Sequence, residues 1–256
     1  MTNQITATYI DHMGSDLSVV NAARVSFGKE SFGESIEYDL FHDDPDAIKA
    51  SVVKYKEEGW VITTDVDDWK LTITKPTMGD AKLINYLAKH KHISPFGHAF
   101  ASFHVKAPIF VARQLVKHKF LRWNEISRRY VDDEPEFYVP DVWRGRSADK
   151  KQGSEGEVTS YTLYYDFAYY GMEQPLELYK KLLDDGVAPE QARMVLPQST
   201  MTEWYWSGSL DAFADMCRLR CASDTQYETR LVADDISKKM SELFPVSWAA
   251  LMVCRS

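Results

Sequence analysis

The sequence contains little cysteine, with only Cys217, Cys221 and Cys254 among its 256 residues. Three cysteines cannot build the dense disulfide framework of a small secreted domain. Cys217 and Cys221 lie four residues apart in a predicted helix, where we expect them to pack as small apolar side chains. The cysteine content therefore favours a protein of the reducing cytoplasm.

Long hydrophobic runs are also missing. No apolar stretch approaches the roughly 20 residues that cross a bilayer, and the start MTNQITATYIDHMGSD lacks the basic and apolar regions of a secretory signal. The net charge of −8, from 30 basic and 38 acidic residues, argues against a surface that binds nucleic acid or an anionic membrane. We therefore expect a soluble cytoplasmic protein.

The common nucleotide and nucleophile motifs are absent. The chain has neither GxGxxG nor GxxxxGK[ST], and it has no GxSxG elbow. Any bound nucleotide must therefore be held in another way.

What is present is a mixture of helical and strand patterns with 45% apolar residues, enough for a substantial core. The patterns predict an α+β (α/β) fold, a single mixed domain over 1–256 with helices around a small sheet. In the first half of the chain, the patterns predict a helix from Leu17 that runs into a short strand ending at Phe27, a helix around Leu83–Leu87, a strand over Phe100–Lys106 and a helix opened by Pro108. A polar surface loop is expected over Gly145–Gly156. After it, the patterns predict a tyrosine-rich helix over Thr159–Leu183 capped near Gly186, a helix that starts at Pro189 and two helices over Ser209–Phe244.

An acidic excursion interrupts this pattern between Ser31 and Thr77, where 11 acidic and 5 basic residues occur. Within it, the β-rich runs Trp60–Thr64 and Lys70–Thr74 predict a hairpin. We interpret the segment at about 31–77 as an insertion.

Cationic residues gather between Lys106 and Arg129, where seven basic residues accompany one acidic residue, Glu125. Such crowding favours a phosphate-bearing ligand, although a solvated basic face explains it about as well. Five of the seven histidines fall within 29 positions, at His90, His92, His98, His104 and His118. They lack the i, i+4 spacing of a helical zinc pair, and no metal is expected.

The stretch from Gln114 to Tyr130, QLVKHKFLRWNEISRRY, is specific. It resembles the signature of flavin-dependent thymidylate synthases, in which Arg-His-Arg is followed after seven residues by Ser, although Lys117 and Lys119 replace both arginines. Further stretches resemble family blocks in family order: 22–27, 89–96, 103–108, 137–140, 192–197 and Leu219-Arg220 with Gln226 and Glu228 following.

The resemblance implies a homotetramer that converts dUMP to dTMP, with methylenetetrahydrofolate as one-carbon donor, FAD as cofactor and NADPH as reductant, and without a cysteine nucleophile. None of the cysteines follows a proline, as the nucleophile of classical thymidylate synthases does. The resemblance implies that Arg220 is catalytic, facing the uracil. The implied dUMP ligands are Gln114, Lys117, Glu125, Ser127, Arg128, Arg129, Arg193 and Arg220, with Arg193 supplied by a neighbouring subunit. The implied FAD and folate ligands are His92, Ser94, Lys117, His118, Lys119, Glu125, Ser209, Asp215 and Asp224.

Some of these positions depart from the family pattern. Asp224 stands where relatives commonly have histidine, and Ser209 and Asp215 stand where they often have asparagine. We hypothesise that Lys117 or Lys119 pairs with Asp224. Arg122 and Trp123 are bulkier than expected for the signature loop and could alter selectivity.

Two alternatives remain open on the sequence. A pyrimidine-nucleotide (dUMP) hydroxymethylase of the same family would quench the same intermediate with water. A nucleic-acid-binding protein would use the Lys106–Arg129 region, with Trp123 and Tyr130 as stacking aromatics. The remaining aromatics of the tyrosine-rich helix are interpreted as core residues: Tyr161, Tyr164, Tyr165, Phe167, Tyr169 and Tyr170.

Overall fold

The computed structural model describes residues 5–57, 60–65, 69–130, 133–148 and 153–253. The backbone divides into two compact units. The first comprises Met1–Tyr9, Phe103–Ser207 and Met216–Asp235, and the second comprises Ile10–Ser102, Gly208–Asp215 and Ile236–Ser256. A four-stranded sheet with the order β1-β5-β9-β6 contributes strands to both units, because the division falls within three of its strands. Its members are β1 (Thr6–Met13), β5 (Phe100–Pro108), β6 (Leu121–Glu125) and β9 (Met201–Ser209).

In the first unit, alternate residues of β5 and β9 form the core. Phe103, Val105, Trp204 and Trp206 are all essentially buried. This alternation matches the two-residue period of a strand with one buried face. The helices of this unit are α4 (Ile109–Leu115), α5 (Tyr161–Ala168), α6 (Gln174–Asp184), α7 (Pro189–Ala192), part of α8 (Leu210–Arg220) and part of α9 (Tyr227–Leu243), with a 3₁₀ turn η4 (Arg193–Val195).

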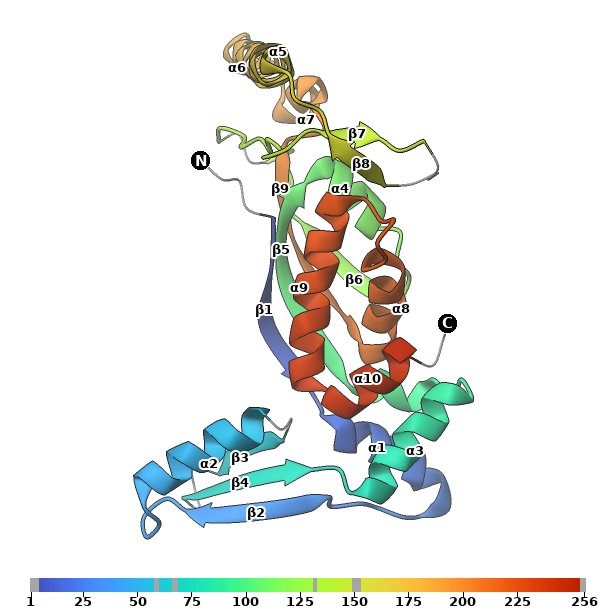
Figure 1. Ribbon diagram of the computed structural model, residues 1–256. Coiled ribbons are helices and arrows are strands. Elements are labelled where there is room, and N and C mark those ends of the chain that lie inside the picture. The colour runs from blue at the N-terminus through green and yellow to red at the C-terminus, as the bar shows by residue number, and fades with distance from the viewer. Residues whose placement is uncertain (1–4, 58–59, 66–68, 131–132, 149–152, 254–256) are drawn as a thin grey trace. The chain divides into compact units, whose positions relative to one another are not determined.

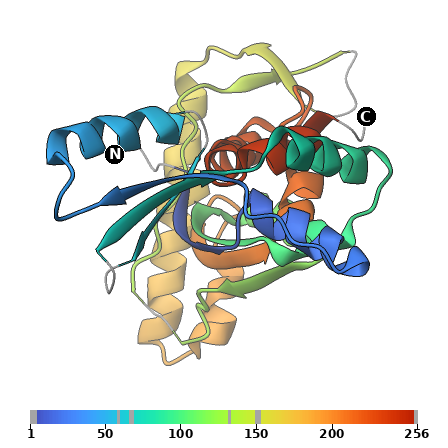
Figure 2. The same cartoon turned by 90° about the horizontal axis from the view of Figure 1, so that it is seen from below.

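Helices α5 and α6 join through a π-helical turn, η3 (Tyr169–Glu173), into one nearly continuous rod (Figure 2). Gly186 ends this rod with φ of +84°. Its N–H donates to Leu183 O over 2.9 Å and the next N–H, of Val187, donates to Leu182 O over 2.9 Å. This is a Schellman cap, in which glycine adopts the left-handed conformation at no steric cost, and the cap predicted at Gly186 is confirmed.

A short antiparallel pair follows β6 in the first unit, formed by β7 (Arg144–Arg146) and β8 (Ser154–Glu157) (Figure 1). The prediction of a polar loop over 145–156 is wrong for these residues. Strands of three and four residues are too short to display an alternating apolar pattern, so the sequence offered no strand signal. Residues 149–152 of the predicted loop lie outside the described residues.

In the second unit, α1 (Asp16–Arg24), α3 (Met78–Lys89), α10 (Pro245–Val253) and the 3₁₀ turn η2 (Ser94–His98) pack together. Asp16 joins two of them, because its carboxylate accepts the N–H groups of Val246 and Ser247 at 3.0 and 2.9 Å. These are the N–H groups that the start of α10 leaves without a helical partner. The short strand predicted to end at Phe27 is wrong, since Val25–Phe27 forms a 3₁₀ turn, η1.

The acidic excursion has a sheet, a helix and a core of its own. Strands β2 (Glu34–Asp39), β4 (Lys70–Lys75) and β3 (Val61–Asp65) pair antiparallel in that order, and α2 (Pro45–Glu57) lies along one face (Figures 1 and 2). Ile48 from α2 packs against Leu71 and Ile73 from β4. The predicted hairpin is confirmed for β3 and β4, while residues 66–68 of its turn lie outside the described residues.

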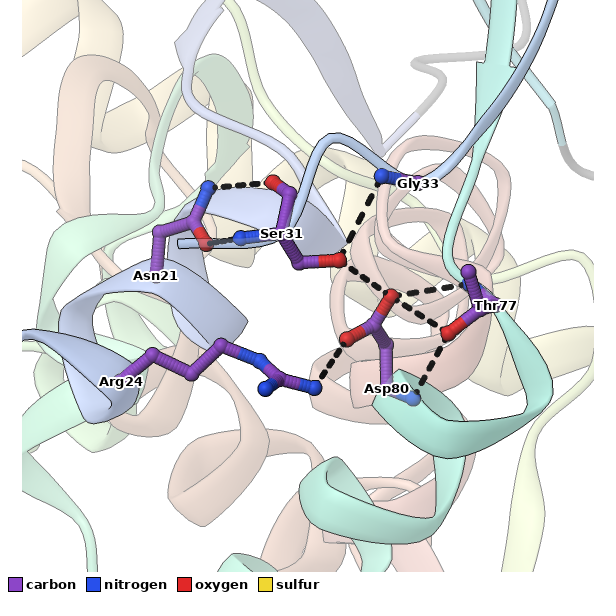
Figure 3. Close-up of polar contacts among 6 residues, drawn as sticks. All are labelled: Asn21, Arg24, Ser31, Gly33, Thr77 and Asp80. Carbon is purple, nitrogen blue, oxygen red and sulfur yellow. Dashed lines mark hydrogen bonds and ion pairs between the residues drawn. The ribbon is translucent and has the colours of Figure 1, made fainter. Parts of the chain in front are cut away.

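A buried carboxylate, Asp80, holds both ends of this excursion (Figure 3). Asp80 is fully buried and accepts hydrogen bonds from Ser31 Oγ at 2.7 Å and from Thr77 Oγ1 at 2.7 Å. Arg24 Nη2 lies 2.8 Å from its other oxygen, and Asn21 exchanges two hydrogen bonds with the backbone of Ser31. Thr77 also caps α3 by accepting from the Asp80 N–H. The excursion therefore leaves and rejoins the unit at one group.

Two further predictions change in the structure. Pro108 ends β5 and is the N-cap of α4 rather than its first residue. The tyrosine-rich helix exists, but four of its tyrosines are not core residues, since Tyr165 is 71% and Tyr170 65% exposed, and Tyr164 and Tyr169 are also accessible. Phe167 is half-buried. Helical periodicity located the helix but carried no information on what covers its faces. The side chain of Tyr161 lies outside the described residues.

Candidate active site

A cavity of about 890 Å³ opens in the first unit. This volume lies near the upper end of the range for small-molecule sites, about 300–1,000 Å³. Its walls come from α4, α8, the start of α9, the segment 138–144, β8 and the residues before β9. Apolar wall residues are Phe110, Pro140, Val142, Trp143, Phe167 and Pro197, and polar ones include Gln114, Lys117, Tyr138, Arg144, Ser199 and Arg220.

Arg220, the residue predicted to be catalytic, lines this cavity at the end of α8. Its Nε–H donates to His118 Nε2 over 3.0 Å. The accepting nitrogen therefore carries no proton, which assigns the imidazole proton to Nδ1 in this arrangement. Burial lowers the pKa of Arg220 from the usual arginine range, yet a guanidinium remains charged at neutral pH. His118 thus fixes the direction of a partly buried cation.

Gln114 and Lys117 line the same cavity, as predicted for nucleotide ligands. Gln114 Nε2 donates to Gln226 Oε1, and Gln114 Oε1 accepts from Thr229 Oγ1 at 3.2 Å. Because Gln226, just before α9, and Thr229, on α9, hold the two ends of this amide, its orientation is set before a ligand arrives. The structure thus brings together three residues separated by as many as 106 positions in sequence, Gln114, Lys117 and Arg220.

An ion pair that the sequence did not single out forms another part of the wall. Arg144 Nη2 contacts Glu228 Oε1, while Arg144 Nε donates to Ser154 Oγ at 2.9 Å. Tyr138 donates its hydroxyl to the same Glu228 oxygen at 3.3 Å. Burial, together with the charge of Glu228, raises the pKa of Tyr138, so its hydroxyl stays protonated and acts as a donor. Arg144 also lies over the ring of Tyr227, 4.5 Å from its centroid.

Two donors in the cavity wall lack partners. Ser199 is more than nine-tenths buried, and neither its Oγ nor Trp143 Nε1 meets a hydrogen-bond partner among the described residues. Both residues line the cavity. Buried polar atoms are nearly always bonded, and an exception at a cavity wall indicates a group that a ligand or water would satisfy.

Glu125 lies outside the cavity lining, and both its carboxylate oxygens already accept hydrogen bonds. Thr202 Oγ1 donates to Oε1 at 2.7 Å, and Trp123 Nε1 donates to Oε2 at 3.1 Å. Trp123 stacks on Trp204 with centroids 4.3 Å apart. The expectation that Arg122 and Trp123 belong to a loop is wrong, since both lie on β6, where the ring of Trp123 has neighbours in the core.

Four other predicted dUMP ligands, Ser127, Arg128, Arg129 and Arg193, belong to the first unit but lie away from this cavity. Arg129 Nε lies 3.8 Å from Glu190 Oε2, and Arg193 Nε donates to Glu190 O at 3.3 Å. Ser127 Oγ accepts the Arg129 N–H at 3.4 Å. Arg128 is directed elsewhere, donating to Asp133 O at 2.9 Å. None of these four side chains lines the cavity within the chain described.

The predicted flavin and folate ligands fall in both units. His118, Lys117, Lys119 and Asp224 belong to the first unit. Lys119 and Asp224 are exposed, and the described residues show no ion pair between Asp224 and either lysine. The hypothesis of that pairing is therefore not supported. Of the other predicted ligands, Glu125 lies in the first unit, and His92, Ser94, Ser209 and Asp215 lie in the second.

The structure shows what surrounds two histidines of the cluster and one of the cysteines. His90 packs on Tyr86 with centroids 4.2 Å apart, and His104 lies 2.9 Å from Glu203. Within the described part of the chain, no group of three metal-ligating side chains converges. Cys217 is buried, as predicted, and burial raises the pKa of its thiol; Cys254 lies outside the described residues.

Sequence reasoning assigned no role to four cavity residues, Tyr138, Arg144, Ser199 and Glu228. Tyr138 and Glu228 fall within or beside stretches that resemble family blocks, which was the available signal. Arg144 and Ser199 carried none, because an arginine on a three-residue strand and a lone serine have no distinctive pattern.

The chain is similar to known proteins over most of its length. The family model for thymidylate synthase complementing protein, Thy1, matches residues 8–246. A flavin-dependent thymidylate synthase of Thermus thermophilus is 36% identical over 246 residues, covering 94% of this chain and 73% of the relative. One from Thermosipho melanesiensis is 35% identical, covering 84% and 88%. In the described residues, no helix has the length and apolar character to cross a membrane.

Solved structures of a UMP/dUMP methylase, PolB from Streptomyces cacaoi, are also similar. The structure bound with 5-Br dUMP has a TM-score of 0.70 and 30% identity, covering 97% of this chain and 95% of that one. The structure bound with 5-Br UMP has a TM-score of 0.72 and 28% identity, covering 98% and 95%. With its mixed α/β fold and the match over nearly its whole length, the chain belongs to the flavin-dependent thymidylate synthase family.

Proposed function

We propose that the cavity around Arg220 binds dUMP for its conversion to dTMP. The chain is a methyltransferase of the flavin-dependent thymidylate synthase family, and the observation that carries the assignment of the site is that Gln114, Lys117 and Arg220 line one cavity with Arg220 anchored on His118. A guanidinium and an amide complement the carbonyls and N3–H of a uracil edge, and the cation stabilises negative charge that develops on the ring.

The residues present fit a flavin at the cationic end of α4. Lys117 and Lys119 are exposed beside His118, and such cations match the charge of a flavin dinucleotide's pyrophosphate. The bound flavin would supply hydride chemistry that side chains lack. In this proposal Lys117, His118 and Lys119 hold FAD with contributions from His92, Ser94, Ser209, Asp215 and Asp224, while methylenetetrahydrofolate and NADPH are co-substrates. Glu125 remains a dUMP and flavin ligand in this proposal, because each of its oxygens accepts one hydrogen bond, from Trp123 or Thr202, and keeps a second lone pair for a ligand.

The phosphate end of dUMP requires a neighbouring copy of the chain in this proposal. Ser127, Arg129 and Arg193 do not line the cavity of their own chain, so they would complete the cavity of another copy. A homotetramer with shared sites satisfies this requirement. A phosphate that displaces the Glu190 carboxylate would release Arg129 for charge-assisted hydrogen bonds, whereas Arg193 contacts the main-chain carbonyl of Glu190 through Nε.

The product of one incubation tests the function. Purified protein is supplied with FAD, dUMP, methylenetetrahydrofolate and NADPH, and the mass of the nucleotide is measured by mass spectrometry. We expect the mass of dTMP; the mass of 5-hydroxymethyl-dUMP would indicate the hydroxymethylase instead. A protein that takes up no flavin and leaves dUMP unchanged would contradict both. The Arg220→Ala variant is the matched control, because it removes the proposed uracil contact and leaves the α4 cations in place.

A further inference from the structure

Beyond the proposed uracil contacts, the cavity wall carries a buried carboxylate with an unused oxygen. The contacts that the described residues make to Glu228 fall on Oε1, from Arg144 and Tyr138. The side chain is only 5% exposed, and the residue lines the cavity. Its Oε2 is therefore left to accept a hydrogen bond from something inside the cavity.

The charge of this group selects the kind of ligand atom that it accepts. Arg144 neutralises Glu228 through the ion pair, and the carboxylate repels a phosphate, so the pair does not form an anion site. A uracil edge is an equally poor match, because its N3–H stands between two carbonyl oxygens that a carboxylate would face. An alcohol is the matching donor, and carboxylates commonly recognise the hydroxyls of a ribose in this way.

Ser199 supplies an independent observation. Its buried hydroxyl has no partner among the described side chains and backbone, although it lines the cavity. A hydroxyl both donates and accepts, so a sugar hydroxyl could satisfy it in either sense. Trp143 adds a second unpartnered donor to the same wall.

Building on the proposed function, we propose that Glu228 and Ser199 form the sugar-recognition part of the cavity, with Glu228 accepting a hydrogen bond from a hydroxyl of the bound nucleotide's pentose. Arg144 and Tyr138 are positioning residues that hold the carboxylate from one side and leave Oε2 to the ligand. A 2′-hydroxyl both donates and accepts, so the Glu228 carboxylate and the Ser199 hydroxyl would offer it partners, and we expect UMP to bind in addition to dUMP.

Calorimetric titration with three nucleotides tests this. The full-length protein is titrated with UMP, dUMP and 2′,3′-dideoxy-UMP, which differ only in sugar hydroxyls. We expect UMP to bind with an affinity comparable to that of dUMP, and the dideoxy nucleotide to bind at least about tenfold more weakly, the loss that follows removal of one hydrogen bond to a charged group. Equal affinity for dUMP and its dideoxy analogue in the wild type overturns the proposal, and failure of UMP to bind overturns its ribose part.

Variants separate recognition from a structural role. In Glu228→Gln, the difference between dUMP and the dideoxy nucleotide should fall below about threefold, whereas a group that only holds Arg144 would weaken all three ligands equally and leave the difference intact. Ser199→Ala should weaken UMP or dUMP about threefold to tenfold relative to the dideoxy nucleotide, and equal losses exclude Ser199. Tyr227→Phe is the control, because it keeps the ring beside Arg144 and changes neither hydroxyl contact.

The same titrations distinguish this proposal from the function on which it rests. If none of the three nucleotides binds, the assignment of the cavity to a uridine nucleotide fails. If dUMP binds without dependence on sugar hydroxyls, only the role of Glu228 and Ser199 fails. Should Glu228→Gln not fold, the wild-type series and the smaller change Ser199→Ala still decide the outcome.

Discussion

The guanidinium of Arg220 and the imidazole of His118 form a hydrogen bond of 3.0 Å in which the histidine is the acceptor. The two residues are 102 positions apart in sequence. Arg220 lines the cavity, and the hydrogen bond to His118 fixes the orientation of its guanidinium. The family signature and the proposed catalytic residue meet at this contact.

The first prediction concerns this pair. Arg220→Ala should reduce turnover of dUMP by about 10²- to 10³-fold, the loss typical of removing a group that stabilises developing negative charge. Flavin absorbance of the purified variant should be unchanged, because Lys117 and Lys119 remain. Steady-state kinetics and the visible spectrum together measure both effects.

Arg220→Lys refines that test, since it keeps the charge and removes the planar fork that reaches His118. Its turnover should lie between those of the wild type and the alanine variant. Lys238→Ala, which removes an exposed cation of α9, controls for net charge. Wild-type turnover in Arg220→Ala would remove the arginine from the mechanism.

A second prediction concerns the group that closes the base of the excursion. Thr77→Ala should destabilise the protein by about 1 kcal/mol through loss of the helix cap, and Asp80→Asn by about 1–3 kcal/mol because buried donors lose a charged partner. Urea unfolding measures both. Thr77→Ser, which keeps the hydroxyl, should match the wild type.

The contribution of Asp80 should depend on pH with a definite sign. Burial opposes its ionisation, but hydrogen bonds from Ser31, Thr77 and Arg24 hold its pKa below the usual value. A lowered folded-state pKa stabilises the fold above the unfolded pKa, about 3.9, and this stabilisation is lost as the pH falls through the folded value. The stability difference between wild type and Asp80→Asn should therefore be constant near neutrality and shrink below about pH 4.

A third prediction concerns Gly171, in the π-helical turn between α5 and α6. A Cβ at this position would lie 2.9 Å from Phe167 Cδ2, and both residues line the cavity. Gly171→Ala should displace the Phe167 ring, cost about 1–3 kcal/mol of stability and weaken nucleotide binding. Gly79→Ala is the matched control, because the nearest side-chain atom is 3.6 Å away and alanine favours a helix. Unchanged nucleotide affinity in Gly171→Ala would mean that the ring does not shape the ligand site.

A fourth prediction tests chemistry without a cysteine nucleophile. Cys217 is buried, donates to Ala233 O at 3.5 Å and has a raised thiol pKa, conditions that suppress the thiolate. Cys217→Ala should cost about 1–2 kcal/mol of stability and leave turnover per folded molecule unchanged. Cys221→Ala and Cys254→Ala should also leave turnover unchanged, and loss of activity in any one of the three without unfolding would restore a cysteine to the mechanism.

Much of the fold could be predicted from periodicity and caps. The apolar pattern identified α3 and β5, and a glycine after an amphipathic run identified the end of α6. Strand β9 was missed although Trp204 and Trp206 alternate with polar neighbours, which is the two-residue period of a strand. The pattern of β9 is thus visible in the sequence, at Trp204 and Trp206.

The residues of the candidate site also fall into two groups, those that the sequence indicated and those that only the fold reveals. Lys117 and Arg220 belong to stretches whose spacing is distinctive, so the sequence indicated them and the fold brought them to one cavity. Arg144 and Ser199 depend on tertiary packing alone, since Arg144 becomes a wall residue only when a short strand pair forms beside Glu228. The prediction that the tyrosines of α5 belong to the core was wrong for a related reason. A helix pattern shows which residues share a face, whereas burial requires another part of the protein to cover that face.

The convergence of Ser31 and Thr77 on Asp80 has a consequence for how this protein can vary. Because the chain departs and returns at one carboxylate, the length of what lies between has no effect on the spacing of α1 and α3. A relative or a designed variant that replaces 34–75 with a tight turn can keep the same junction. The three-stranded sheet can thus be exchanged as a module while the hydrogen bonds that Ser31 and Thr77 make to Asp80 are kept.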